Sequence, residues 1–135
     1  MGRSDSGETD LGALLAGLRP QLATGEFVFC SVAGSYGDFA QFEPLAVFAE
    51  AEGLSLVLSL ERAVEAGLSC GQPMRCITLG IHSSLEAVGL TAAVAGALAE
   101  RGIPANVIAG YHHDHLFVPA ARSGEALDVL ASLGS

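Results

Sequence analysis

The sequence predicts a protein of the α+β class, built as two small sandwiches that each pack helices on one face of an antiparallel sheet. Three observations carry this prediction. The chain has 135 residues, half of them hydrophobic, which is one ordinary domain or two very small ones. Helical and strand-like patterns alternate along it, with one hairpin pattern in each half. A break at 70–73 separates the halves, so we expect a tail over residues 1–9 and domains over 10–72 and 73–135.

The first half is predicted to begin with a helix and to continue into a sheet. The spacing of Leu11, Leu14, Leu15 and Leu18 is helical, with Asp10 as N-cap and Pro20 closing the segment. The apolar run Phe27–Val32 predicts a strand. The elements expected after it are a loop over 33–43, hairpin strands over 45–49 and 54–60, and a short helix over 61–66 that ends at Gly67.

The second half is predicted to begin with a strand and to continue into a longer helix, a hairpin and a closing helix. A strand is expected over 75–82. Ser83 and Glu86 then have the spacing of a capping box, which predicts a helix that runs to a C-terminal glycine at Gly102. The elements expected after it are a strand over 105–109, a polar turn over 110–114, a strand over 115–118 ended by Pro119, and a closing helix over 126–133.

The charge of the chain excludes several classes of function. It has six cationic and fifteen acidic residues, for a net charge of −9. All six are Arg and they are scattered, so the chain lacks the basic stripe of a nucleic-acid or anionic-membrane partner. No apolar run reaches the length of a membrane span, and the N-terminus is polar and acidic. We therefore expect a cytoplasmic protein that binds neither nucleic acid nor membrane.

Three cysteines stand at positions 30, 70 and 76, without the C-x-x-C spacing of a redox or zinc motif. Cys30 lies within an apolar run, where a free thiol behaves as a small buried hydrophobe. The sequence thus predicts three structural cysteines with no chemical role.

The histidine cluster at 111–115, Tyr-His-His-Asp-His, is the one place where a metal site can be imagined. Its ligands would be His113, Asp114 and His115, with His82. In an extended segment, however, Asp114 points away from the two histidines, and no metal-site signature accompanies them. We expect imidazoles that hydrogen-bond to the backbone, with no metal and no cofactor; the cluster, which includes His112, has no further predicted role. A Ser–His–Asp triad also lacks support, because the chain has no nucleophile-elbow motif.

The start of the helix after residue 82 is the most interesting candidate site. A helix N-terminus offers free N–H groups and a positive dipole end, which together bind carboxylates. Ser83 and Ser84 add hydroxyl groups, and Gly89 lets the backbone approach a ligand. The alternative is that Ser83 only caps the helix and that Gly89 only packs.

The second half also resembles a known family. The stretch IAGYHHDHLFV at 108–118, preceded by ALAERGI at 97–103, resembles ACT domains of the aspartate-kinase regulatory type and bacterial tandem-ACT proteins of unknown function. The stretches GEFVFC at 25–30 and EGLSLV at 52–57 resemble a partner ACT domain. The resemblance covers nearly the whole chain from about residue 10. It departs from the family's kinases in that no catalytic domain is attached and in the histidines of the turn.

The resemblance implies two ferredoxin-like sandwiches of βαββα type and a non-enzymatic regulatory module. Such domains bind small ligands, typically amino acids, at interfaces between ACT units, so we expect an amino-acid ligand and a homodimer. The alternatives are a module that binds only protein and, third, a metal protein that uses the histidine turn. The ligand-binding positions that the resemblance implies are Ser83, Ser84, Leu85, Val88, Gly89, Leu90, Asn106, Val107 and Ile108.

Overall fold

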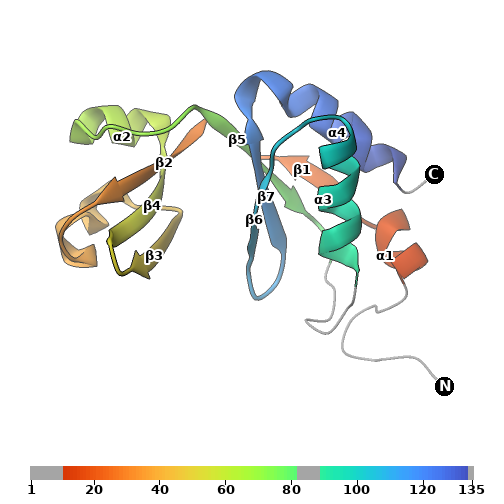
Figure 1. Ribbon diagram of the computed structural model, residues 1–135, viewed down its shortest axis with the longest axis horizontal. Coiled ribbons are helices and arrows are strands. Elements are labelled where there is room, and N and C mark those ends of the chain that lie inside the picture. The colour runs from red at the N-terminus through yellow and green to blue at the C-terminus, as the bar shows by residue number, and fades with distance from the viewer. Residues whose placement is uncertain (1–10, 82–88, 134–135) are drawn as a thin grey trace. The chain divides into compact units, whose positions relative to one another are not determined.

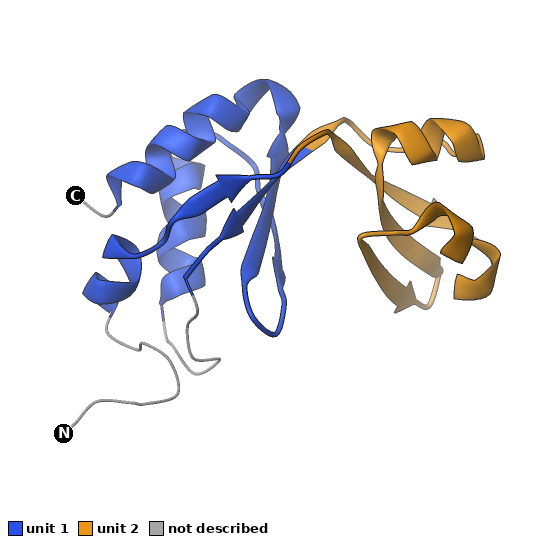
Figure 2. Ribbon diagram, turned by 180° about the vertical axis from the view of Figure 1, so that it is seen from behind, with its two compact units in different colours: residues 1–23, 75–135 blue, residues 24–74 orange. Residues whose placement is uncertain are grey.

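A computed structural model describes residues 11–81 and 89–133 of the chain, and it divides the chain into two compact units (Figure 2). Unit 2 is continuous, over residues 24–74, whereas unit 1 combines residues 1–23 with residues 75–135. Residues 11–23 thus belong with the C-terminal half of the chain. The sequence-based division at 72/73 lies close to one boundary of unit 2, but the units themselves do not follow the two sequence halves.

Unit 1 is a four-stranded sheet covered by three helices (Figure 1). The strand order is β1-β5-β7-β6, with β1 antiparallel to β5 and β6 antiparallel to β7. A 3-10 turn, η3 (Ala120–Arg122), leads into the last helix. The elements are β1 (Pro20–Leu22), β5 (Met74–Leu79), β6 (Asn106–Ala109), β7 (Asp114–Pro119), α1 (Leu11–Ala16), α3 (Leu90–Glu100) and α4 (Ser123–Ser132).

The core of unit 1 follows from the alternation of side chains along its strands. Ile77 and Leu79 of β5 are buried in one cluster with Leu116 and Val118 of β7 and with leucines from all three helices. The residues between them, such as Thr78, belong to the opposite face of the sheet. The helices therefore cover one face, as the sequence predicts.

Unit 2 is a three-stranded antiparallel sheet in the order β3-β4-β2. Its core gathers alternate residues of β2 and β4 with Ala63 of the helix. Two short 3-10 turns stand in the loop after β2, where unit 1 has the long helix α3. The elements are β2 (Phe27–Val32), β3 (Ala46–Glu50), β4 (Gly53–Ser59), α2 (Leu60–Ala66), η1 (Tyr36–Asp38) and η2 (Ala40–Phe42).

The hairpins of the two units are built in the same register. Ala46 pairs with Val57 and Val47 with Leu56 in unit 2. The matching pairs in unit 1 are Asn106 with Phe117 and Val107 with Leu116. The tandem organisation expected from the sequence is thus present at the level of individual residue pairs.

Two expected elements differ from the structure. Pro20 does not merely close the first helix; it begins β1, whose partner β5 lies far along the chain. Helix α3 is described from Leu90, with Gly89 as its N-cap. Gly89 has φ 96°, a left-handed conformation that glycine adopts without strain. Ser83 and Glu86, the expected capping box, lie outside the described residues.

Two of the three cysteines are joined in a disulfide that was not predicted from the sequence. Cys30 and Cys70 form a disulfide, with their Cα atoms 4.7 Å apart. An isolated β-bridge joins the same two residues, so the backbone itself brings the sulfur atoms within bonding reach. Cys76 is free and buried, as expected.

Candidate functional site

Of the nine predicted ligand-binding positions, the structure describes five. Ser83, Ser84, Leu85 and Val88 lie outside the described residues. The five that can be placed are Gly89 and Leu90 at the start of α3, and Asn106, Val107 and Ile108 on β6. Figure 1 shows the start of α3 at the same end of unit 1 as the β6–β7 hairpin.

The N-terminus of α3 is suited to an anion. Its first free N–H groups have no acceptor within the helix, and they carry the positive end of the helix dipole. The first turn of α3 contains no acidic residue that would neutralise this charge. Leu90 is buried in the core, whereas Thr91 and Ala92 are exposed. Leu90 therefore anchors the start of α3 in the core, while the next two residues are exposed to solvent.

The three positions on β6 divide between the two faces of the sheet. Val107 packs against the core cluster that contains Leu90. Asn106 and Ile108 alternate with it and therefore share the opposite face, where Ile108 pairs with His115. Asn106 is exposed and Ile108 is half-buried. Leu90 and Val107 are thus core residues. Asn106 and Ile108 lie on the face of the sheet away from the helices, so the structure does not bring them together with Gly89 within unit 1.

Two histidines of the 111–115 cluster hydrogen-bond to β5 and to Ile81, two residues after its end. His115 Nδ1 lies 2.9 Å from the Thr78 hydroxyl, and His113 Nδ1 lies 3.3 Å from the carbonyl oxygen of Ile81. Because a carbonyl only accepts, His113 Nδ1 carries the proton in this bond. The imidazoles therefore fix the hairpin against the chain that leads toward α3. Sequence reasoning missed Thr78, although the alternation of β5 places it on the face of His115.

A metal site finds no support in the described part of the chain. No group of three or more His, Cys, Asp or Glu side chains there is close enough to hold a metal ion. His82, the fourth ligand in the metal hypothesis, lies outside the described residues. Nor does any helix within 11–81 or 89–133 have the length and apolar character to cross a membrane.

Cys76 is the one free thiol of the chain, and it is poorly suited to nucleophilic chemistry. Its side chain is 3% exposed. Burial raises the pKa of the Cys76 thiol, and a hydrogen bond with Thr78 offsets only part of that rise. A thiol that is both inaccessible and protonated at neutral pH does not attack a substrate.

In unit 2, the loop after β2 contains Asp38, whose carboxylate accepts a hydrogen bond within the same loop. The backbone N–H of Ser35 donates to Asp38 Oδ2 at 3.0 Å. Gly34, with φ 119°, leaves room for this carboxylate, since a Cβ atom there would lie 2.8 Å from the same oxygen. The loop that corresponds to the start of α3 is thus closed by Asp38.

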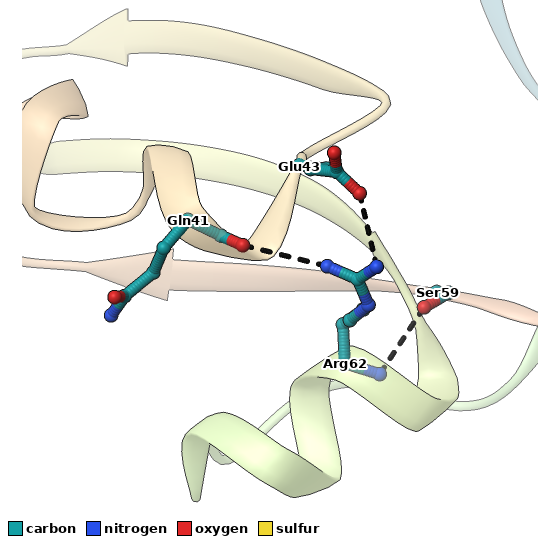
Figure 3. Close-up of polar contacts among 4 residues, drawn as sticks. All are labelled: Gln41, Glu43, Ser59 and Arg62. Carbon is teal, nitrogen blue, oxygen red and sulfur yellow. Dashed lines mark hydrogen bonds and ion pairs between the residues drawn. The ribbon is translucent and has the colours of Figure 1, made fainter.

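The two units share a second feature, an arginine that follows the hairpin. Arg62 donates to the carbonyl of Gln41 and pairs with Glu43 at 3.0 Å (Figure 3). Arg122 of unit 1 donates to the carbonyls of Arg101 and Gly102, which follow α3. Each arginine therefore fastens the end of the preceding helical segment to the start of the next helix.

Comparison with known families identifies the family of this chain. An ACT-domain profile matches residues 6–75, and a second ACT-domain profile matches residues 72–132. The chain belongs to the ACT-domain family. Its sandwiches are the ferredoxin-like kind that the resemblance implies, and the ACT family explains why the two hairpins share one register.

Solved ACT-like structures agree with this assignment. A Vibrio cholerae protein of unknown function, described as a possible transport protein, is 50% identical, with a TM-score of 0.87 over 93% of this chain and 96% of that one. An Agrobacterium tumefaciens protein is 18% identical, with a TM-score of 0.72 over 85% and 87% of the two chains.

The regulatory subunit of aspartate kinase from Thermus flavus is 9% identical, with a TM-score of 0.62 over 86% and 97% of the two chains. At such identities the likeness shows the fold alone. A search of curated proteins finds no match.

Proposed function

We propose that this protein is a non-enzymatic regulatory module that binds an amino acid, works as a homodimer and holds its ligand at an interface between ACT units. The ligand carboxylate would sit at the N-terminus of α3, with Ser83, Ser84, Leu85, Val88, Gly89 and Leu90 around it. Asn106, Val107 and Ile108 would come from β6 of the second copy at the interface. Within this set, Leu90 and Val107 act through their backbone, because their side chains belong to the core.

The observation that carries the proposal is the N-terminus of α3, whose first turn has no acidic residue. A ligand carboxylate there would interact favourably with the free N–H groups and with the positive end of the helix dipole. The contrast with unit 2 supports this assignment, because Asp38 already occupies the corresponding loop there. We therefore place one ligand per chain, in unit 1.

The first experiment is a thermal-shift screen of the full chain against the twenty amino acids, related metabolites and divalent metals. A ligand at about 100 times its dissociation constant adds roughly 2.7 kcal/mol of stability, which is several degrees in a protein of this size. A shift with one amino acid supports the proposal. A shift with zinc or manganese alone would favour the histidine turn instead, and a flat screen would favour a module that binds only protein.

The position of the carboxylate is tested by Thr91→Asp, with Thr91→Asn as the matched neutral control. Thr91 is exposed in the first turn of α3, where a carboxylate side chain is compatible with the helix dipole. We expect T91D to keep the stability of the protein and to weaken ligand binding about tenfold, because it competes with the ligand carboxylate. T91N should bind as the wild type does. Equal affinities of the two variants would contradict this placement of the ligand.

A further inference from the structure

The disulfide of unit 2 joins a buried cysteine to a more accessible one. Cys30 lies in β2, belongs to the core cluster of unit 2 and is 4% exposed. Cys70 follows α2 and is only partly buried, at the margin of the same cluster. A thiolate that opens a disulfide attacks one of its two sulfurs, and access decides which one it reaches. Cys70 is therefore the sulfur open to attack, and Cys30 is the sulfur that leaves.

The disulfide is also the strongest link between β2 and the segment 68–73. On one side, β2 pairs with β4 along its whole length. On the other side, this segment meets β2 at the isolated bridge between Cys30 and Cys70, where the N–H of Gly71 donates to the carbonyl of Phe29 at 3.1 Å. One backbone hydrogen bond adds little net stability. Opening the disulfide therefore frees this segment from β2.

Unit 2 depends on this link because of its size. It spans residues 24–74, and domains below about 70–80 residues rarely have a core large enough to fold without a crosslink, a metal or a partner. The disulfide joins positions 40 residues apart within it. Unit 1 has a core cluster of its own. Opening the bond should thus loosen unit 2 and leave unit 1 folded.

The surroundings of Cys70 suit both redox states. The backbone bridge holds the two sulfurs together in the oxidised state. In the reduced state the Cys70 thiol has an acceptor, because the carbonyl oxygen of Leu68 lies 3.7 Å from Cys70 Sγ. Cys76 cannot replace either cysteine, since it is buried in unit 1.

We propose that Cys70 is a site of thiol–disulfide exchange with a small thiol of the glutathione class, and that Cys30 and Cys70 form a reversible redox switch of unit 2. The incoming thiolate bonds to Cys70 Sγ, the bond between the two cysteines breaks, and the Cys30 sulfur takes up a proton. A second thiolate then attacks the small-thiol sulfur of this mixed disulfide, which releases Cys70 and the oxidised small molecule. Two small thiols thus supply the two electrons, and the reverse reaction closes the bond. The inference rests on neither the ligand nor the homodimer of the proposed function.

The first test treats the oxidised full chain with reduced glutathione, blocks free thiols with N-ethylmaleimide at intervals and maps the products by mass spectrometry. Trypsin cleaves after Arg62 and Arg75, which places Cys30, Cys70 and Cys76 on three separate peptides. We expect about 10 mM reduced glutathione to open the disulfide and an excess of oxidised glutathione to close it. The mixed disulfide should form on Cys70 at least about tenfold more than on Cys30. A bond that opens only in denaturant, or a mixed disulfide mainly on Cys30, would overturn the proposal.

Cys30→Ser and Cys70→Ser are matched variants, because each keeps one cysteine of the pair. With oxidised glutathione, C30S should form its mixed disulfide at least about tenfold faster than C70S, since only C30S keeps the accessible sulfur. Equal rates in two folded variants would contradict the assignment of Cys70. Circular dichroism verifies the folding, and if either variant is unfolded the mapping of the wild type decides.

Hydrogen exchange of the wild type tests the consequence of reduction without any substitution. Reduction should speed the exchange of residues 68–73 at least about tenfold and leave β7 and α4 of unit 1 unchanged. The variant C76A should respond as the wild type does. Exchange in 68–73 that does not change on reduction, or a response that is lost in C76A, would show that the pair is not a switch of unit 2.

Discussion

Glycines at two positions play opposite structural roles, and alanine substitution separates them. Gly53 has φ 143°, and a Cβ atom there would lie 2.6 Å from the carbonyl oxygen of Val32. Gly96 lies in the middle of α3, and a Cβ atom there would meet nothing within 4 Å. We expect Gly53→Ala to lower the free energy of unfolding by about 2–3 kcal/mol. Gly96→Ala should raise it by about 0.5–1 kcal/mol.

Urea unfolding of both variants measures this contrast, and each serves as the control for the other. Two changes of the same sign would contradict the conformations described for these glycines.

The Cys76 thiol makes the stability depend on alkaline pH. Since burial raises its pKa in the folded protein, the unfolded chain loses this proton first as the pH rises. The free energy of unfolding therefore falls above about pH 9, by at most about 1.4 kcal/mol per pH unit, until the folded thiol also ionises. Cys76→Ala should show a shallower decline between pH 8.5 and 10.5. Because the sequence has no lysine and both proteins keep the same tyrosines, the difference in slope reports the thiol. Identical slopes would refute this assignment.

Among the elements, the segment from β2 to the end of α2 depends on the disulfide. Cys30 and Cys70 are separated by 40 residues, and closing a loop of that length stabilises the folded state by about 2–4 kcal/mol relative to the open chain. We expect dithiothreitol to lower the urea midpoint of the wild type accordingly. The double variant C30A/C70A should be insensitive to the reductant, whereas C76A should keep the full sensitivity. A wild-type midpoint that reductant leaves unchanged would contradict this prediction.

Local patterns predicted the elements well and long-range contacts poorly. Phe27–Val32 and the hairpin of unit 2 appear where the apolar runs place them, because alternation and turn residues are local signals. Strand β1 was not predicted, since its three residues have no pattern of their own and depend on β5. The disulfide was missed for the same reason: three cysteines allow three pairings, and only the fold brings Cys70 beside Cys30.

The candidate site was predictable in part. The residues of β6 are where the sequence places them, whereas α3 is described from Leu90, after the capping box that the sequence predicts. The period-two alternation of a strand already separates Val107 from Asn106 and Ile108. The sequence could not reveal that the Asp38 carboxylate accepts a hydrogen bond from the backbone of its own loop. This hydrogen bond to Ser35 depends on the turn that Gly34 permits.

At the scale of the whole molecule, unit 2 is an insertion into a hairpin of unit 1. Leu22 pairs with Ile77, and the N–H of Ala23 donates to the carbonyl of Cys76 at 2.9 Å. The two ends of the insertion in unit 1 are therefore adjacent. We expect a shortened chain in which Asn-Gly replaces residues 24–75 to fold as unit 1, because this dipeptide forms the two-residue turn that joins antiparallel strands and keeps Ala23 opposite Cys76.

A cooperative thermal transition and a near-native circular dichroism spectrum of the helices would support this prediction. The control replaces the same residues with Pro-Pro, which cannot form that turn. A shortened chain with Asn-Gly that is unfolded, or one no more stable than the Pro-Pro control, would show that unit 1 requires the insertion.

Because unit 1 is split in the sequence, its two parts are synthesised at different times. Strand β1 leaves the ribosome before all of unit 2, while its partner β5 follows it. At about 5–20 residues per second, β1 waits roughly 3–10 s for β5 to be made. During this interval unit 2 is being synthesised and its strands can pair as they emerge, whereas the apolar face of α1 still lacks the later strands and helices of its core cluster. Unit 2, in the middle of the sequence, can therefore fold first during synthesis. Unit 1, which is proposed to bind the ligand, can fold only after the C-terminal part of the chain has been made.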